Sequence, residues 1–84
     1  MIAIYSRAQA FAVATESVEL AKYNLDNAYR DWKRRNGINH LILKGGASWH
    51  AMMLATKPEY RAVLNAKARK HRAEKKLLQA VEVV

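Results

Sequence analysis

Cysteine is absent from this chain of 84 residues, which excludes disulfide bonds and thiolate metal sites. A chain this short holds one domain with a modest hydrophobic core. Small folds without a disulfide or metal staple often gain stability by self-association. The composition therefore favours a single domain, residues 1–84, that associates with copies of itself.

Acidic residues are scarce: seven Asp and Glu stand against 15 Lys and Arg, a formal net charge of +8. Such an excess favours anionic partners such as nucleic acid or an acidic protein surface. Long apolar runs are also missing, since none reaches the roughly 20 residues that span a bilayer. No basic segment precedes the apolar N-terminus, as a signal peptide would require. We therefore expect no membrane partner and a cytoplasmic location.

Helix breakers are few, with one Pro and three Gly, and none lies between residues 3 and 35. A heptad repeat runs through this segment, with large residues at one position and alanine three positions later. Gly37 follows as a helix stop, because glycine adopts the left-handed cap conformation without steric cost. We predict a helix over about 3–35. The large residues are Ile4, Phe11, Val18, Leu25 and Trp32, and the alanines are Ala14, Ala21 and Ala28.

A second long helix is predicted over about 57–82. Thr56 and Glu59 have the spacing of a capping box, in which each side chain bonds the other residue's backbone N–H. Pro58 falls in the first turn, where its missing N–H is harmless. The heptad continues here with Lys70 at one of the large positions. The other large positions are Val63, Leu77 and Val84, and the alanines are Ala66, Ala73 and Ala80.

The two repeats predict an all-α fold: an antiparallel helical hairpin held by an alanine-containing heptad seam. The expected register places Leu25 near Ala66 and Phe11 near Ala80 and Val84. The apolar connector, residues 36–55, should contain a short helix with Trp49, Met52 and Met53 on one face.

One face of the second long helix carries only cations. Projected at 100° per residue, six Lys and Arg share an arc that contains no acid, whereas an ordinary solvated face mixes signs. The simpler interpretation is a cationic surface that only keeps the protein soluble, and the more specific one is a surface that binds phosphate groups. We call this set the basic stripe: Lys57, Arg61, Arg69, Arg72, Lys75 and Lys76.

A further apolar edge on the same helix predicts a second neighbour, most simply another copy in a four-helix bundle or a higher oligomer. Polar residues interrupt this edge. They are interpreted either as one polar layer that sets the register or as an anion pocket between subunits. The candidate pocket residues are Lys67, Lys70, His71, Glu74 and Tyr5.

Catalytic and metal-binding patterns are lacking. His40, His50 and His71 share no ligand spacing, so no metal is expected. No nucleophile–base–orienter set is recognisable, so we expect neither an enzyme nor a cofactor.

The leading hypothesis is a non-enzymatic protein whose basic stripe binds nucleic acid. One alternative is an inhibitor or adaptor that docks on an acidic surface of a host protein. Another is an oligomer that captures an anionic nucleotide between subunits. A small, basic, cysteine-free helical chain also resembles the accessory proteins of phages and mobile elements, which would place it in the cytoplasm of the host cell.

Overall fold

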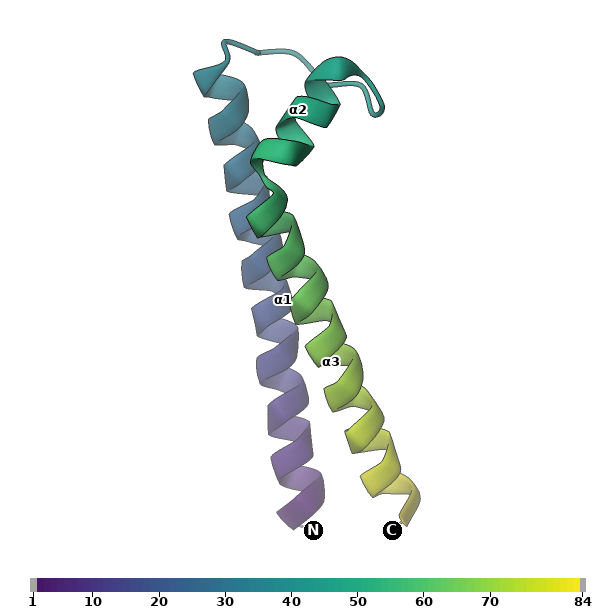
Figure 1. Ribbon diagram of the computed structural model, residues 1–84. Coiled ribbons are helices and arrows are strands. Elements are labelled where there is room, and N and C mark those ends of the chain that lie inside the picture. The colour runs from purple at the N-terminus through teal and green to yellow at the C-terminus, as the bar shows by residue number, and fades with distance from the viewer. Residues whose placement is uncertain (1, 84) are drawn as a thin grey trace.

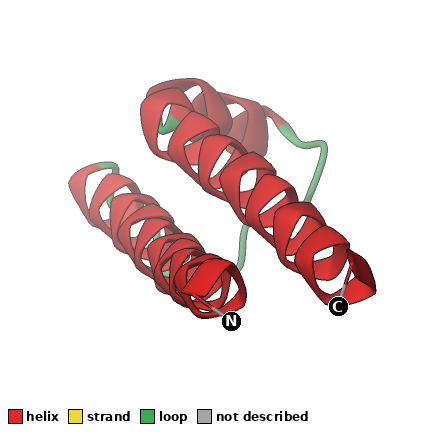
Figure 2. Ribbon diagram, turned by 90° about the horizontal axis from the view of Figure 1, so that it is seen from below, coloured by secondary structure: helices red, strands yellow, loops and turns green. Residues whose placement is uncertain are grey.

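The chain folds into three helices: α1 (Ile2–Arg35), α2 (Ala47–Ala55) and α3 (Lys57–Val83). The computed structural model describes residues 2–83, and side chains from residue 4 to 82. α1 and α3 run antiparallel beside each other, and both termini lie at the same end (Figures 1 and 2). The predicted all-α hairpin with a short connecting helix is confirmed. Within residues 2–83, no helix combines the length and apolar content needed to cross a bilayer.

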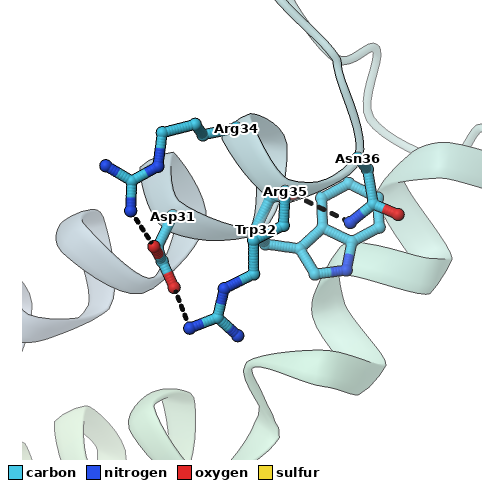
Figure 3. A network of polar contacts seen from close by, with 5 residues as sticks. All are labelled: Asp31, Trp32, Arg34, Arg35 and Asn36. Carbon is cyan, nitrogen blue, oxygen red and sulfur yellow. Dashed lines mark hydrogen bonds and ion pairs between the residues drawn. The ribbon is translucent and has the colours of Figure 1, made fainter.

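α1 ends where the sequence predicts, at a glycine cap. Gly37 has a φ of 66°, in the left-handed region that suits glycine. Its N–H donates to the carbonyl of Arg34, and the N–H of Ile38 donates to the carbonyl of Lys33 at 2.9 Å. These two bonds make a Schellman motif, which satisfies carbonyls at the helix end. The Asn36 side chain also donates to the carbonyl of Trp32 at 2.8 Å (Figure 3).

The predicted capping box is wrong. The Thr56 hydroxyl donates to the carbonyl of Met52 at 2.7 Å, and the Thr56 N–H uses the same acceptor. No bond therefore remains for Glu59 to make with that N–H. Thr56 is instead the C-cap of α2, and Tyr60 N–H donates to its carbonyl as α3 begins. The next turn lacks an N–H at Pro58, which explains why the two helices are interrupted here.

α2 packs at the end of the hairpin, between the loop and α3 (Figure 1). Met52 is buried and Trp49 is half-buried, as expected for one inner face. The Trp49 ring meets the His50 ring edge-on with centroids 5.0 Å apart. Leu41 and Leu43, in the preceding loop, remain 82% and 76% exposed. Much of the apolar connector is therefore left uncovered.

The core between α1 and α3 is narrow. Ala66 is only 1% exposed and Val18 only 3%. Burial this complete at an alanine means that neighbouring atoms approach the α3 backbone closely. The buried apolar side chains of the described residues are Val18, Met52, Val63, Ala66 and Ala80.

The expected pairing register is wrong, while the antiparallel arrangement is right. The Lys70 ammonium lies 6.0 Å from the centroid of the Phe11 ring. Ala10, next to Phe11, shares a groove with Ala73. Phe11 thus lies near the level of residues 70–73, roughly two to three helical turns before Ala80, its expected neighbour. Val84, the other expected neighbour, lies outside the described residues.

The connector explains this shift. α2 packs beside the C-terminal part of α1 (Figure 1). α3 therefore starts closer to the N-terminus of α1 than it would if it followed α1 through a short loop. The Arg7 guanidinium consequently reaches the carbonyl of Lys76 at 3.0 Å. A slide of one heptad leaves the same positions of the repeat facing each other, so periodicity alone does not select the register.

Tyr29 joins the three helices where the hairpin closes. Its hydroxyl donates to the sulfur of Met53 at 3.4 Å. Burial raises the pKa of the Tyr29 phenol, Tyr60 and Asp26 raise it further, and a hydrogen bond with Thr56 acts in the opposite direction.

Ala66→Leu should lower the free energy of unfolding by about 1–3 kcal/mol, because the added side chain has no space beside α1. Ala68→Leu is the matched control, since Ala68 is exposed on the same helix. Thermal unfolding followed by circular dichroism measures both variants. Equal melting temperatures for the two would show that Ala66 does not pack closely against α1.

Tyr29 should contribute a pH-dependent part of the stability. Folding favours the neutral phenol, so this contribution is complete below the ordinary pKa of about 10 and is lost as the pH rises through the higher folded-state pKa. We expect the unfolding free energy of Tyr29→Phe to fall less steeply than that of the wild type above about pH 10. Denaturant titrations at several alkaline pH values test this. Tyr23→Phe, at a residue that is 63% exposed, is the control, and an equal effect there would contradict the assignment.

Candidate anion-binding face

The basic stripe lies on the outer side of α3. All six of its cations are exposed, and they extend along about 28 Å of helix. The structure thus places every predicted stripe residue at the surface of one element. It divides them between two grooves, with Lys75 on the exposed ridge.

The first groove lies between the N-terminal part of α1 and α3. Its volume is about 180 Å³. The stripe contributes Arg69, Arg72 and Lys76, and α1 contributes Arg7. Small side chains form its floor, since the remaining lining residues are Ala10 and Ala73. The groove can therefore seat an anion among four cationic side chains from two helices.

Arg7 was missed by the sequence reasoning. One of its terminal nitrogens donates to the carbonyl of Lys76, which fixes the side chain across the helix pair. A guanidinium has five N–H donors, so this bond leaves others for a ligand. The clue in the sequence was an arginine at an alanine position of the heptad. Only the observed register shows that this position faces the stripe.

The second groove lies at the start of α3 and has a volume of about 530 Å³. Lys57 and Arg61 supply its cations. The other lining residues are apolar or neutral: Leu54, Pro58, Ala62 and Asn65. This groove combines positive charge with an apolar wall, a mixture that suits a nucleotide or a peptide as well as a bare phosphate.

The stripe has no acidic counterpart. Among residues 4–82, the ion pairs are those of Asp31 with Arg34 and with Arg35, the latter at 2.8 Å (Figure 3). Both pairs lie on α1, so no stripe cation in that part of the chain is neutralised by a carboxylate. Like charges four residues apart on a helix are mildly destabilising. The stripe therefore carries unrelieved repulsion that an anionic partner would remove.

The predicted inter-subunit pocket is not assembled within one chain. Lys70 is half-buried over the ring of Phe11, so its side chain belongs to the α1–α3 interface. Lys67, His71 and Glu74 are exposed on another side of α3. On α1, the Tyr5 hydroxyl accepts a bond from the Gln9 side-chain amide, and the residue is 66% exposed.

A mixed-charge groove of about 770 Å³ lies between the C-terminal half of α1 and the start of α3. One carboxylate oxygen of Glu59 is buried there without a hydrogen-bond partner. Its other lining residues are Asn24, Asn27, Ala28, Arg30, Asp31 and Arg34. The acids in this groove make it a poorer anion site than the grooves of the stripe.

Metal coordination has little support in the described part of the chain, where no three His, Asp or Glu side chains are grouped to hold an ion. The Lys and Arg side chains of the stripe offer positive charge and N–H donors, the groups that can hold an anion.

No protein-family model matches this chain, and neither a curated protein nor a solved structure matches it.

Arg7→Ala should weaken binding to a polyanion if Arg7 belongs to the first groove. We expect this variant to elute from immobilised heparin at lower salt than the wild type, because one cation of a convergent set is lost. Arg30→Ala removes the same charge from an exposed site elsewhere on α1 and should elute later than Arg7→Ala. Equal elution of the two variants would show that only net charge matters.

Proposed function

We propose that this chain is a non-enzymatic protein that binds nucleic acid through the basic stripe and Arg7. The observation that carries the proposal is that no stripe cation makes an ion pair in the described part of the chain, while α1 pairs its own Asp31 twice. Duplex DNA carries one negative charge per about 1.7 Å of its axis. A row of cations about 28 Å long could therefore face many phosphates.

Contacts of this kind recognise the backbone and not the base sequence. Base readout requires amide, guanidinium or aromatic groups that reach base edges. Asn65, in the second groove, is the neutral amide among the stripe's neighbours there. We therefore propose binding with little sequence preference and a strong dependence on salt.

We also propose that the hairpin packs through its alanine positions and that the chain self-associates. Complete burial of Ala66 and the small number of buried side chains support these two points. Capture of a nucleotide between subunits has less support, because Lys70 faces Phe11 in its own chain.

Titrating DNA and RNA binding against salt tests the function. The logarithm of the binding constant should fall linearly with the logarithm of salt concentration. The double variant Arg69→Ala/Arg72→Ala should reduce this slope by about two, since each phosphate contact contributes roughly 0.9. Lys22→Ala/Lys33→Ala removes equal charge from α1 and should change the slope less.

Absence of binding at low salt would contradict the nucleic-acid proposal. An acidic protein surface would then be the favoured partner, because it could also neutralise the positive charge of the stripe.

A further inference from the structure

A second repeat of heptad spacing runs along α3, away from α1. Its members are separated alternately by four and three residues and fall within one arc of about 100°. The four apolar members are 40–55% exposed and the three polar members are also exposed. We call this set the second seam: Tyr60, Leu64, Lys67, His71, Glu74, Leu78 and Val81.

The second seam is symmetric in its chemistry about His71. Leu64 and Leu78 each stand seven residues from His71. Lys67 and Glu74 flank it at closer range and carry opposite charges. Further out, Tyr60 and Val81 close the two apolar ends. The order is therefore apolar, cationic, imidazole, acidic and apolar.

This order is complementary to its own reverse. An antiparallel copy of α3, related by a twofold axis near His71, would bring each Lys67 close to Glu74 of the other copy. The apolar ends would meet in the same way, Leu64 beside Leu78. Opposite charges and apolar groups then match on both sides of the axis, as an isologous interface requires. A parallel copy in register would instead set Lys67 against Lys67 and Glu74 against Glu74.

The chain is elongated and exposes more surface than a compact monomer of its size would. The chain exposes 6585 Å², whereas a compact monomer of 9.6 kDa would expose roughly 5,100 Å². Its radius of gyration is 17.6 Å, against roughly 12 Å for a compact domain of this length. The excess of roughly 1,500 Å² per chain, doubled over two copies, falls in the size range of obligate homodimer interfaces.

α1 offers small side chains on the corresponding side. Tyr29 directly follows Ala28 of the first heptad, and Tyr60 directly follows the position one heptad before Ala66. The two tyrosines therefore flank the α1–α3 seam on the same side of the antiparallel pair. Lys22, Thr15 and Ala8 precede Tyr29 by one, two and three heptads, so they lie on that face of α1. Thr15 and Ala8 lie near the level of His71 in the observed register, and their small size there would let a second hairpin approach closely.

We propose that two copies of this chain form an antiparallel dimer through the second seam, with a twofold axis near His71 and reciprocal Lys67–Glu74 pairs. The occupant of this exposed apolar face is thus a second copy of the chain. The inference rests on the self-association proposed above and not on nucleic-acid binding, because the basic stripe lies on another side of α3.

Charge reversal tests the register. Lys67→Glu and Glu74→Lys each place like charges across the interface twice, and each should raise the dimer dissociation constant by about tenfold or more. The double variant Lys67→Glu/Glu74→Lys restores opposite charges and should recover most of the affinity. Sedimentation equilibrium over a range of concentrations measures all four proteins. Failure of the double variant to recover, or a wild type that stays monomeric at high concentration, would overturn the proposal.

A cysteine scan gives a second readout in a chain that has no cysteine of its own. His71→Cys should form a disulfide-linked dimer under mild oxidation, since residues near a twofold axis bring their Cα atoms within the 4.4–6.8 Å, roughly, that a disulfide needs. Ala68→Cys is the control, because Ala68 is exposed on the side of the basic stripe. Equal cross-linking of both variants would overturn the assigned axis.

The two proposals fail separately. If the protein is monomeric but binds DNA with a steep salt dependence, the dimer proposal is wrong and the nucleic-acid proposal stands. If it is dimeric but does not bind DNA at low salt, the dimer proposal stands and the nucleic-acid proposal is wrong.

Discussion

A lone pair of helices can bury only the side chains along one shared line, and this constraint shapes the whole molecule. Burial is complete or nearly so at Val18 and Ala66 but reaches few other residues. The α3 surface is consequently divided into three arcs: one packs on α1, one carries the basic stripe and one carries the second seam. Only the first arc is covered by another part of the chain. The basic stripe and the second seam stay exposed and are the surfaces proposed to bind partners.

The helices and the cap at Gly37 could be predicted because their causes are local: heptad spacing, few helix breakers and a glycine that tolerates positive φ. The register could not, because repeats of equal period match equally well after a slide of one heptad. The packing of α2 decides it, and that depends on tertiary contacts. The capping box failed for a related reason: Thr56 follows another helix directly, so its hydroxyl donates to the carbonyl of Met52.

The stripe was predictable from periodicity, since 100° per residue assigns a face to every cation. Its extension to Arg7 was not, because the approach of residue 7 to the backbone of Lys76 depends on the register. The opposite error occurred at Lys70, which was assigned to the pocket between subunits but lies over Phe11 of its own chain. Sequence reasoning assigned faces well and assigned partners across the hairpin poorly.

The geometry of α3 connects the two proposals. Measured around the helix, α1 and the basic stripe lie on opposite sides of the second seam. A twofold axis perpendicular to α3 would therefore gather both copies of α1 on one side of the dimer and both stripes on the other. The two stripes would run antiparallel, related by the same axis. The strands of a nucleic-acid duplex are also antiparallel and related by twofold axes, so each could face one stripe in an equivalent way. If both proposals hold, we expect such a dimer to bind a duplex more tightly than a single strand.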